Sequence, residues 1–168
     1  MFNRILVPTD FSEPSDAALD YARTLADKFG ASIHVLHIIE LHTAGAFSSE
    51  SYIGPSLYEM QLKEAQSRLA VRVPPSDRAR YGATSEVMTG IAADTIVEFA
   101  EDQHMDLIVM GTHGRTGLAH LLMGSVAEHV VRRSPCPVLT VRHSPAAEAA
   151  TVSRSGQISQ FDSAPGRG

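Results

Sequence analysis

The sequence predicts an α/β fold in which an open, five-stranded parallel sheet carries helices on both faces. Five short apolar segments alternate along the chain with longer segments whose apolar residues recur at helical spacing, and this alternation is typical of a parallel sheet covered by helices. One apolar segment, Leu107-Ile108-Val109-Met110, contains no polar residue. A continuous apolar run of this kind indicates a strand buried on both faces, which is characteristic of parallel sheets.

The first two elements carry the clearest local signals. A strand is expected at residues 4–8 and a helix at residues 13–29, where Ala18, Ala22 and Leu25 share one face. Ser12 stands at the N-cap position and Gly30 follows the last turn, as expected at the two ends of a helix. The same reasoning predicts further strands at residues 32–39, 85–89, 106–111 and 137–142, and further helices at residues 56–73, 91–104 and 124–133.

Three features concern the connections. Pro74-Pro75 is expected to end the second helix. Residues 41–56, rich in Ser, Gly and Ala, are expected to form a long, mobile loop at the carboxyl end of the second strand. Residues 144–168 have little apolar periodicity, which predicts one domain over residues 1–143 followed by a mostly disordered tail; a role for the tail in interactions stays open.

The composition limits the classes of function and partner that the protein can have. The chain of 168 residues carries 14 Lys+Arg and 19 Asp+Glu, a formal net charge of −5, so no general attraction to nucleic acid or to anionic lipid is expected. The apolar stretch before Pro8 is too short for a signal peptide and no apolar run approaches the length of a membrane span, so we expect a cytoplasmic protein. His34 and His37 are three residues apart on a predicted strand, so they face opposite sides and no metal site is expected there.

The most informative motif is GTHGRTGLAHLLMGS, residues 111–125. It joins a predicted strand to a predicted helix. Glycine permits positive φ in a tight turn and, lacking Cβ, lets backbone amides approach a bulky anion. At the helix start the unpaired amides of Gly124, Ser125 and Val126 are expected to point toward the loop and form an anion site. The motif is neither a Walker A loop, because Lys is missing, nor a dinucleotide fingerprint, because it follows a late strand.

The spacing G-x2-G-x9-G-Ser resembles the ATP-binding signature of the universal stress protein family, and the resemblance covers about residues 1–142. It implies a Rossmann-like fold of the adenine nucleotide alpha hydrolase type, with strand order 3-2-1-4-5. It also implies ATP as the ligand, with Mg²⁺ able to arrive with it near Asp10, and a homodimer formed through the last strand, residues 137–142. We therefore expect that strand to lie at a sheet edge.

The same resemblance implies the binding residues. Asp10, flanked by Pro8 and Thr9, is expected to contact the adenosine portion, and the backbone of Ile38 is expected to meet adenine. The phosphate and ribose contacts are expected from Met110, Gly111, His113, Gly114, Arg115, Gly124, Ser125 and Val126. Simpler interpretations stay open: Asp10 can cap the first helix, Gly111 and Gly114 can be turn glycines without a ligand, and His113 and Arg115 can face solvent.

The function expected first is an ATP-binding stress or signalling module, and two other functions compete with it. One is a weak ATPase or self-phosphorylating enzyme, although no motif places a general base and no catalytic residue is assigned. The other is a dimeric scaffold that binds no nucleotide. An unidentified protein partner is expected for the module, because occupancy of the cavity would change the surface that it offers.

Overall fold

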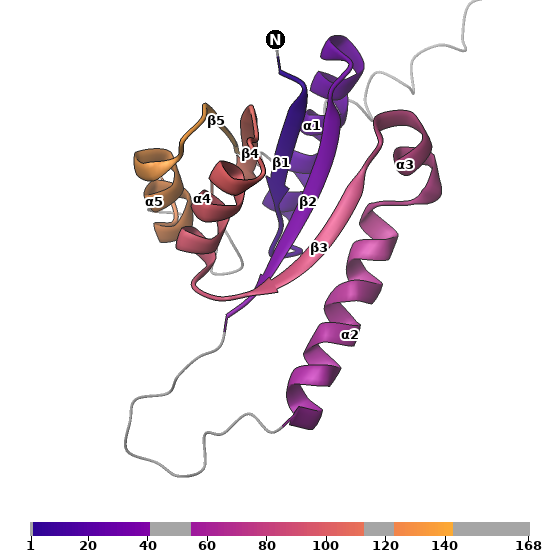
Figure 1. Ribbon diagram of the computed structural model, residues 1–168, viewed down its shortest axis with the longest axis vertical. Coiled ribbons are helices and arrows are strands. Elements are labelled where there is room, and N and C mark those ends of the chain that lie inside the picture. The colour runs from indigo at the N-terminus through magenta and orange to yellow at the C-terminus, as the bar shows by residue number, and fades with distance from the viewer. Residues whose placement is uncertain (1, 41–54, 113–122, 143–168) are drawn as a thin grey trace, which may run out of the picture.

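The computed structural model describes residues 2–40, 55–112 and 123–142, and in these ranges the chain forms one five-stranded parallel sheet (Figure 1). The strands are β1 (Arg4–Pro8), β2 (Ser32–Ile39), β3 (Thr84–Thr89), β4 (Leu107–Gly111) and β5 (Val138–Val141). They pair in the order β3-β2-β1-β4-β5, each pair parallel. The predicted fold class and strand order are therefore confirmed, and β5 lies at a sheet edge as expected.

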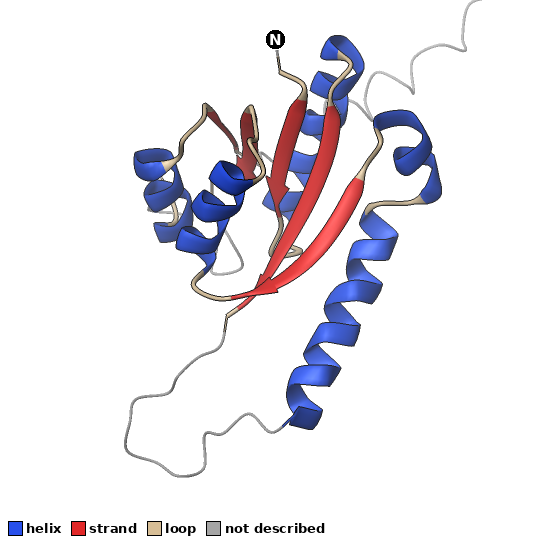
Figure 2. Cartoon of the chain, in the orientation of Figure 1, coloured by secondary structure: helices blue, strands red, loops and turns tan. Residues whose placement is uncertain are grey.

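Helices cover both faces of the sheet (Figure 2). The helices are α1 (Glu13–Phe29), α2 (Pro55–Arg72), α3 (Pro75–Tyr81), α4 (Ala92–Asp102) and α5 (Ser125–Arg133). Side chains of α1 and α2 share one buried cluster with Ile5, Val7 and Val35, whereas those of α4 and α5 share a second cluster with Leu6 and Leu36. Successive strand residues thus enter opposite cores, which explains why residues 5–7 of β1 and 107–110 of β4 are all apolar.

The two histidines of β2 follow the same alternation. His37 packs against Phe11, at the start of α1, with ring centroids 4.2 Å apart. His34 packs against Phe99 of α4 at 4.7 Å. The prediction that they face opposite sides is confirmed. Among the described residues, no group of three or more His, Cys, Asp or Glu side chains is arranged to hold a metal ion.

Helix α3 was not predicted. Pro75 is its first residue and Pro74 its N-cap, and proline is tolerated there because the first helical amide needs no intrahelical partner. The helix ends at Gly82, whose φ of 57° is left-handed, and Arg23 of α1 binds Asp77 with Nε 2.8 Å from Oδ2. Helix α2 ends at Arg72, just before Pro74-Pro75, as expected, and the same two prolines also begin a further helix.

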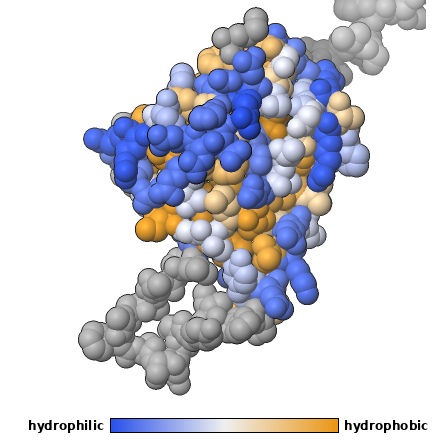
Figure 3. All heavy atoms as spheres, viewed as in Figure 1, coloured by the Kyte–Doolittle hydropathy of each residue, from blue (hydrophilic) through white to orange (hydrophobic). Residues whose placement is uncertain are grey.

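Figure 3 shows polar side chains over much of the visible face and apolar ones toward the end where β2 and β3 finish. Within the described ranges, no helix combines the length and the apolar character needed to cross a membrane. The expected loop at residues 41–56 lies mostly, and the expected tail at residues 144–168 entirely, outside the described residues.

Candidate functional site

A cavity of about 530 Å³ opens at the carboxyl ends of β1, β2 and β4. It lies at a topological switch point, because β1 is followed by α1 on one face of the sheet and its neighbour β4 by α5 on the other. Such points are where open α/β sheets hold ligands. Nine of the predicted site residues line it: Pro8, Thr9, Asp10, Ile38, Met110, Gly111, Gly124, Ser125 and Val126. The other three, His113, Gly114 and Arg115, lie outside the described residues.

Asp10 sits in a turn whose polar groups are bonded on several sides. The Phe11 amide donates to Thr9 Oγ1 at 3.0 Å, and the Ser12 amide donates to Asp10 Oδ1 at 3.1 Å. Thr9 is buried, with its Oγ1 3.0 Å from the Ser15 Oγ, and the Ser15 hydroxyl donates to the Ser12 carbonyl at 2.8 Å. The direction of the Asp10 side chain is thereby set by the packing of α1 against β1.

The expected capping of α1 is corrected by this geometry. Ser12 occupies the N-cap position, but its side chain makes no capping hydrogen bond; its hydroxyl donates to Asp10 Oδ1 instead. Asp10 lies two residues before the N-cap, and its Oδ1 accepts from both the amide and the hydroxyl of Ser12. The helix start is stabilised instead by Pro14 in its first turn and by the acidic residues Glu13 and Asp16.

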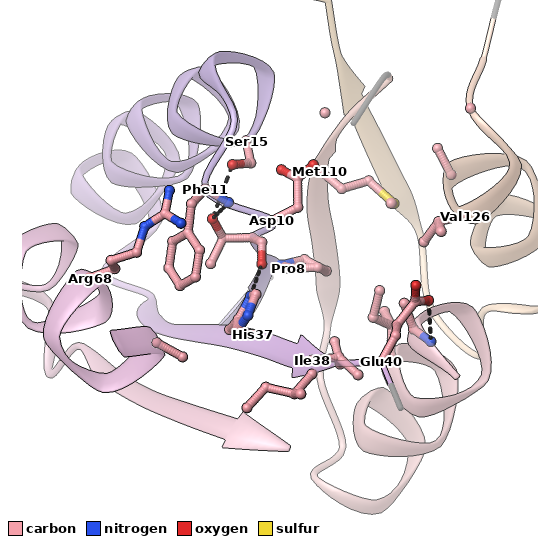
Figure 4. A pocket seen from close by; sticks show the side chains of 18 of the residues that line it. Pro8, Asp10, Phe11, Ser15, His37, Ile38, Glu40, Arg68, Met110 and Val126 are labelled. Atoms are coloured by element: carbon pink, nitrogen blue, oxygen red, sulfur yellow. Dashed lines mark hydrogen bonds between the residues drawn. The ribbon is translucent and has the colours of Figure 1, made fainter. Parts of the chain in front are cut away.

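Three lining residues that were not predicted form one wall of the cavity: Phe11, His37 and Arg68. His37 Nδ1 lies 2.7 Å from the Thr9 carbonyl oxygen, so this nitrogen is the protonated one and donates. The Arg68 guanidinium lies over the Phe11 ring, 4.2 Å from its centroid. Figure 4 shows these side chains on one side of Asp10, with Met110 and Val126 on the other. Only the position of His37 beside Ile38 at a strand end was available as a sequence signal.

Gly111 has a structural reason that the motif did not indicate. It is the last residue of β4, and its φ is not positive, contrary to the expectation of a tight turn. A Cβ added at this position would lie 2.9 Å from the carbonyl carbon and 3.0 Å from the carbonyl oxygen of Pro14. Gly111 is therefore needed because the first turn of α1 packs directly against β4.

The start of α5 also differs from expectation. Gly124 is the N-cap with a φ of −73°, a conformation open to any residue. Its amide is not unpaired, because it donates to the Thr112 carbonyl at 2.7 Å. The amides that remain at the helix start are those of Ser125, Val126 and Ala127, which precede the first i−4 acceptor of the helix. All three residues line the cavity, where helix-terminal amides favour an anion.

Comparison with known proteins agrees with this architecture. The model of the universal stress protein family matches residues 1–142. A universal stress protein of Methanocaldococcus jannaschii is 34% identical over 142 residues, covering 84% of this chain and 83% of the relative. The solved structure of universal stress protein UspA from Lactobacillus plantarum is 27% identical, with a TM-score of 0.71 over 84% of this chain and 98% of that one.

A second solved relative, a universal stress protein in complex with cAMP, is 27% identical with a TM-score of 0.57. It covers 85% of this chain, which spans 98% of it. The family model, the relatives and the strand order all refer to the same part of the chain, residues 1–142. The chain belongs to the universal stress protein family.

Proposed function

We propose that the cavity binds an adenine nucleotide, ATP above all, and that the protein acts as a nucleotide-responsive module. The observation that carries the proposal is that the Asp10 turn and the first amides of α5 line one cavity at the switch point of the sheet. A carboxylate suits ribose hydroxyls or an amino group, and helix-terminal amides suit phosphate. The solved family member in complex with cAMP supports an adenine nucleotide as the ligand class.

The apolar part of the lining supports the base position. Ile38, Ile96 and Met110 line the cavity on the α4 and α5 side. A flat ring of moderate polarity gains free energy by leaving water for such a wall. With adenine against this wall and ribose at Asp10, the phosphates extend toward the start of α5, and Mg²⁺ would enter with them. Asp10 and Ile38 keep the roles predicted for them, whereas Met110, expected on the phosphate and ribose side, is assigned to the base together with Ile96.

Titration of the wild type with adenosine, AMP and ATP tests the proposal. Asp10→Ala should weaken all three by roughly 10- to 100-fold, because a hydrogen bond to a charged group is lost. Asp20→Ala is the matched control. Asp20 is an exposed carboxylate of α1, and its ion-pair partner Arg23 lies three residues further along the same helix. Calorimetry measures the affinities, and the same ATP samples analysed for ADP measure turnover.

The outcomes separate the competing functions. Binding without ADP formation is the expected result and favours a module that responds to occupancy. Binding with steady ADP formation favours the weak ATPase. A folded wild type that binds none of the three ligands contradicts the proposal and favours a scaffold, as does an Asp10→Ala variant with unchanged affinities for adenosine and AMP.

We further propose that the protein forms a homodimer through β5. This strand is at the sheet edge, and Leu139 within it is 38% exposed. An apolar edge strand has unpaired backbone groups that a second copy can satisfy. Leu139→Lys places a charge on that edge and should convert the dimer to a monomer in light scattering at micromolar concentration. A wild type that is monomeric with and without ATP would contradict this proposal.

A further inference from the structure

Phe11 has a backbone conformation that a bulky residue rarely adopts. Its φ is 65°, and among the described residues the only other non-glycine residue with positive φ is His104, which follows α4. The left-handed region is unfavourable for side chains with a Cβ. Such residues persist when their surroundings hold them in place, and they concentrate at functional sites. Phe11 directly follows Asp10 and lines the cavity.

Contacts from helix α2 and strand β2 hold Phe11. The ring is buried, with 8% of the residue exposed, and it packs against the imidazole of His37. The Arg72 guanidinium lies 4.9 Å from the ring centroid, and Arg72 Nη2 donates to the Phe11 carbonyl at 3.3 Å. The Phe11 carbonyl is attached to the Cα atom and moves when φ rotates, so a hydrogen bond to this oxygen resists rotation away from the left-handed conformation.

Arg72 is fixed in turn by α1. Its Nε donates to Asp16 Oδ1 at 2.6 Å and its Nη2 to Asp16 Oδ2 at 3.0 Å. A two-point bond of this kind fixes the plane of the guanidinium. The side chain is only 19% exposed. Arg72 therefore connects α2 to the Asp10 turn through a rigid geometry, although it is absent from the cavity lining.

We propose that Arg72 is a positioning residue for the Asp10 carboxylate, acting through the Phe11 carbonyl. The inference rests on the proposed function, because it takes Asp10 as a ligand contact. Arg72 keeps Phe11 left-handed, Phe11 fixes the backbone on the carboxyl side of Asp10, and the carboxylate then faces the cavity before the ligand arrives. Preorganisation of this kind raises affinity without any contact between Arg72 and the ligand.

The test is a double-mutant cycle with ATP as the probe. Arg72→Met should weaken ATP binding about tenfold, while Arg72→Lys, which keeps the charge but not the two-point geometry, should recover only part of the loss. In the Asp10→Ala background, Arg72→Met should cause no further loss, because the group that it positions is gone. The matched control is Arg80→Met, since Arg80 forms an exposed ion pair with Asp27 far from the turn.

Each outcome decides the inference. An equal loss in the wild-type and Asp10→Ala backgrounds assigns Arg72 a general structural role and overturns the proposal, as does an Arg72→Met variant that binds ATP like the wild type. If Arg72→Met does not fold, Asp16→Asn weakens the bond that fixes the guanidinium while keeping Arg72. The same double-mutant cycle is then measured with Asp16→Asn in the wild-type and Asp10→Ala backgrounds. A folded wild type that does not bind ATP or adenosine overturns the proposed function and this inference with it.

Discussion

The two sides of the cavity are built in different ways. On the β1 side, the turn that carries Asp10 is held by side chains of α1, α2 and β2. On the β4 side, the start of α5 offers backbone amides, and the bond of Gly124 to the Thr112 carbonyl joins the two ends of the segment 113–122, which lies outside the described residues. On the β1 side, side-chain packing determines where the binding groups lie. On the β4 side, the position of a helix determines it.

This difference assigns different roles to residues that look alike in the motif. Gly111 is required by the packing of α1 on β4. Gly124 has a backbone conformation that any residue can adopt, so we propose that its small size serves the ligand beside the α5 amides. The comparison therefore separates a glycine that serves the fold from one that we assign to the ligand.

The largest effect is expected for Gly111→Val. The new side chain would meet the Pro14 backbone, which cannot yield as a flexible side chain does, so α1 must move away from β4. Overpacking of this kind should reduce the free energy of unfolding by about 3 kcal/mol. Urea denaturation, monitored by circular dichroism, measures the decrease in the free energy of unfolding. Unchanged stability would mean that α1 does not pack against β4 as closely as the structure has it.

Gly124→Val should have a smaller effect, and on binding instead of stability. A branched side chain at the N-cap narrows the approach to the amides of Ser125 and Val126, so the ATP affinity should fall about tenfold, or about 1.4 kcal/mol. Adenosine, which has no phosphate, should bind as it does to the wild type. Calorimetry with both ligands measures the difference. Equal losses of affinity for ATP and for adenosine would contradict the assignment of the α5 side of the cavity to phosphate.

The contrast also explains what the sequence predicts and what it does not. The alternation of apolar and amphipathic segments predicted the sheet and four of the helices, because burial determines residue type along each element. Helix α3 was missed because prolines both end and begin helices. Phe11, Arg68 and Arg72 were missed because their contacts join segments far apart in the chain. The role of Gly111 was missed for the same reason, since it depends on where α1 lies.

The smallest effect concerns His34, which lies on the α4 face of the sheet, away from the Asp10 turn. Burial lowers the pKa of His34 below its ordinary value of 6.5, with the nearby Glu86 opposing the shift. Among the described residues its Nε2 has no hydrogen-bond partner, and Nδ1 lies 2.8 Å from the Thr84 hydroxyl. The neutral ring is thus the form that the folded state accommodates.

The sign of the pH dependence follows from that shift. The unfolded state takes up a proton as the pH falls through about 6.5, whereas the folded state resists until the lowered pKa is reached, so the contribution of His34 to stability is present above about pH 6.5 and lost below it. His34→Gln keeps a polar side chain that cannot titrate. Between about pH 7.5 and about pH 5, its stability should therefore fall less than that of the wild type. Urea midpoints across this range measure the difference, and parallel curves would contradict it. ATP affinity at neutral pH should be unchanged, because the Asp10 turn is fixed by His37 on the opposite face of the same strand.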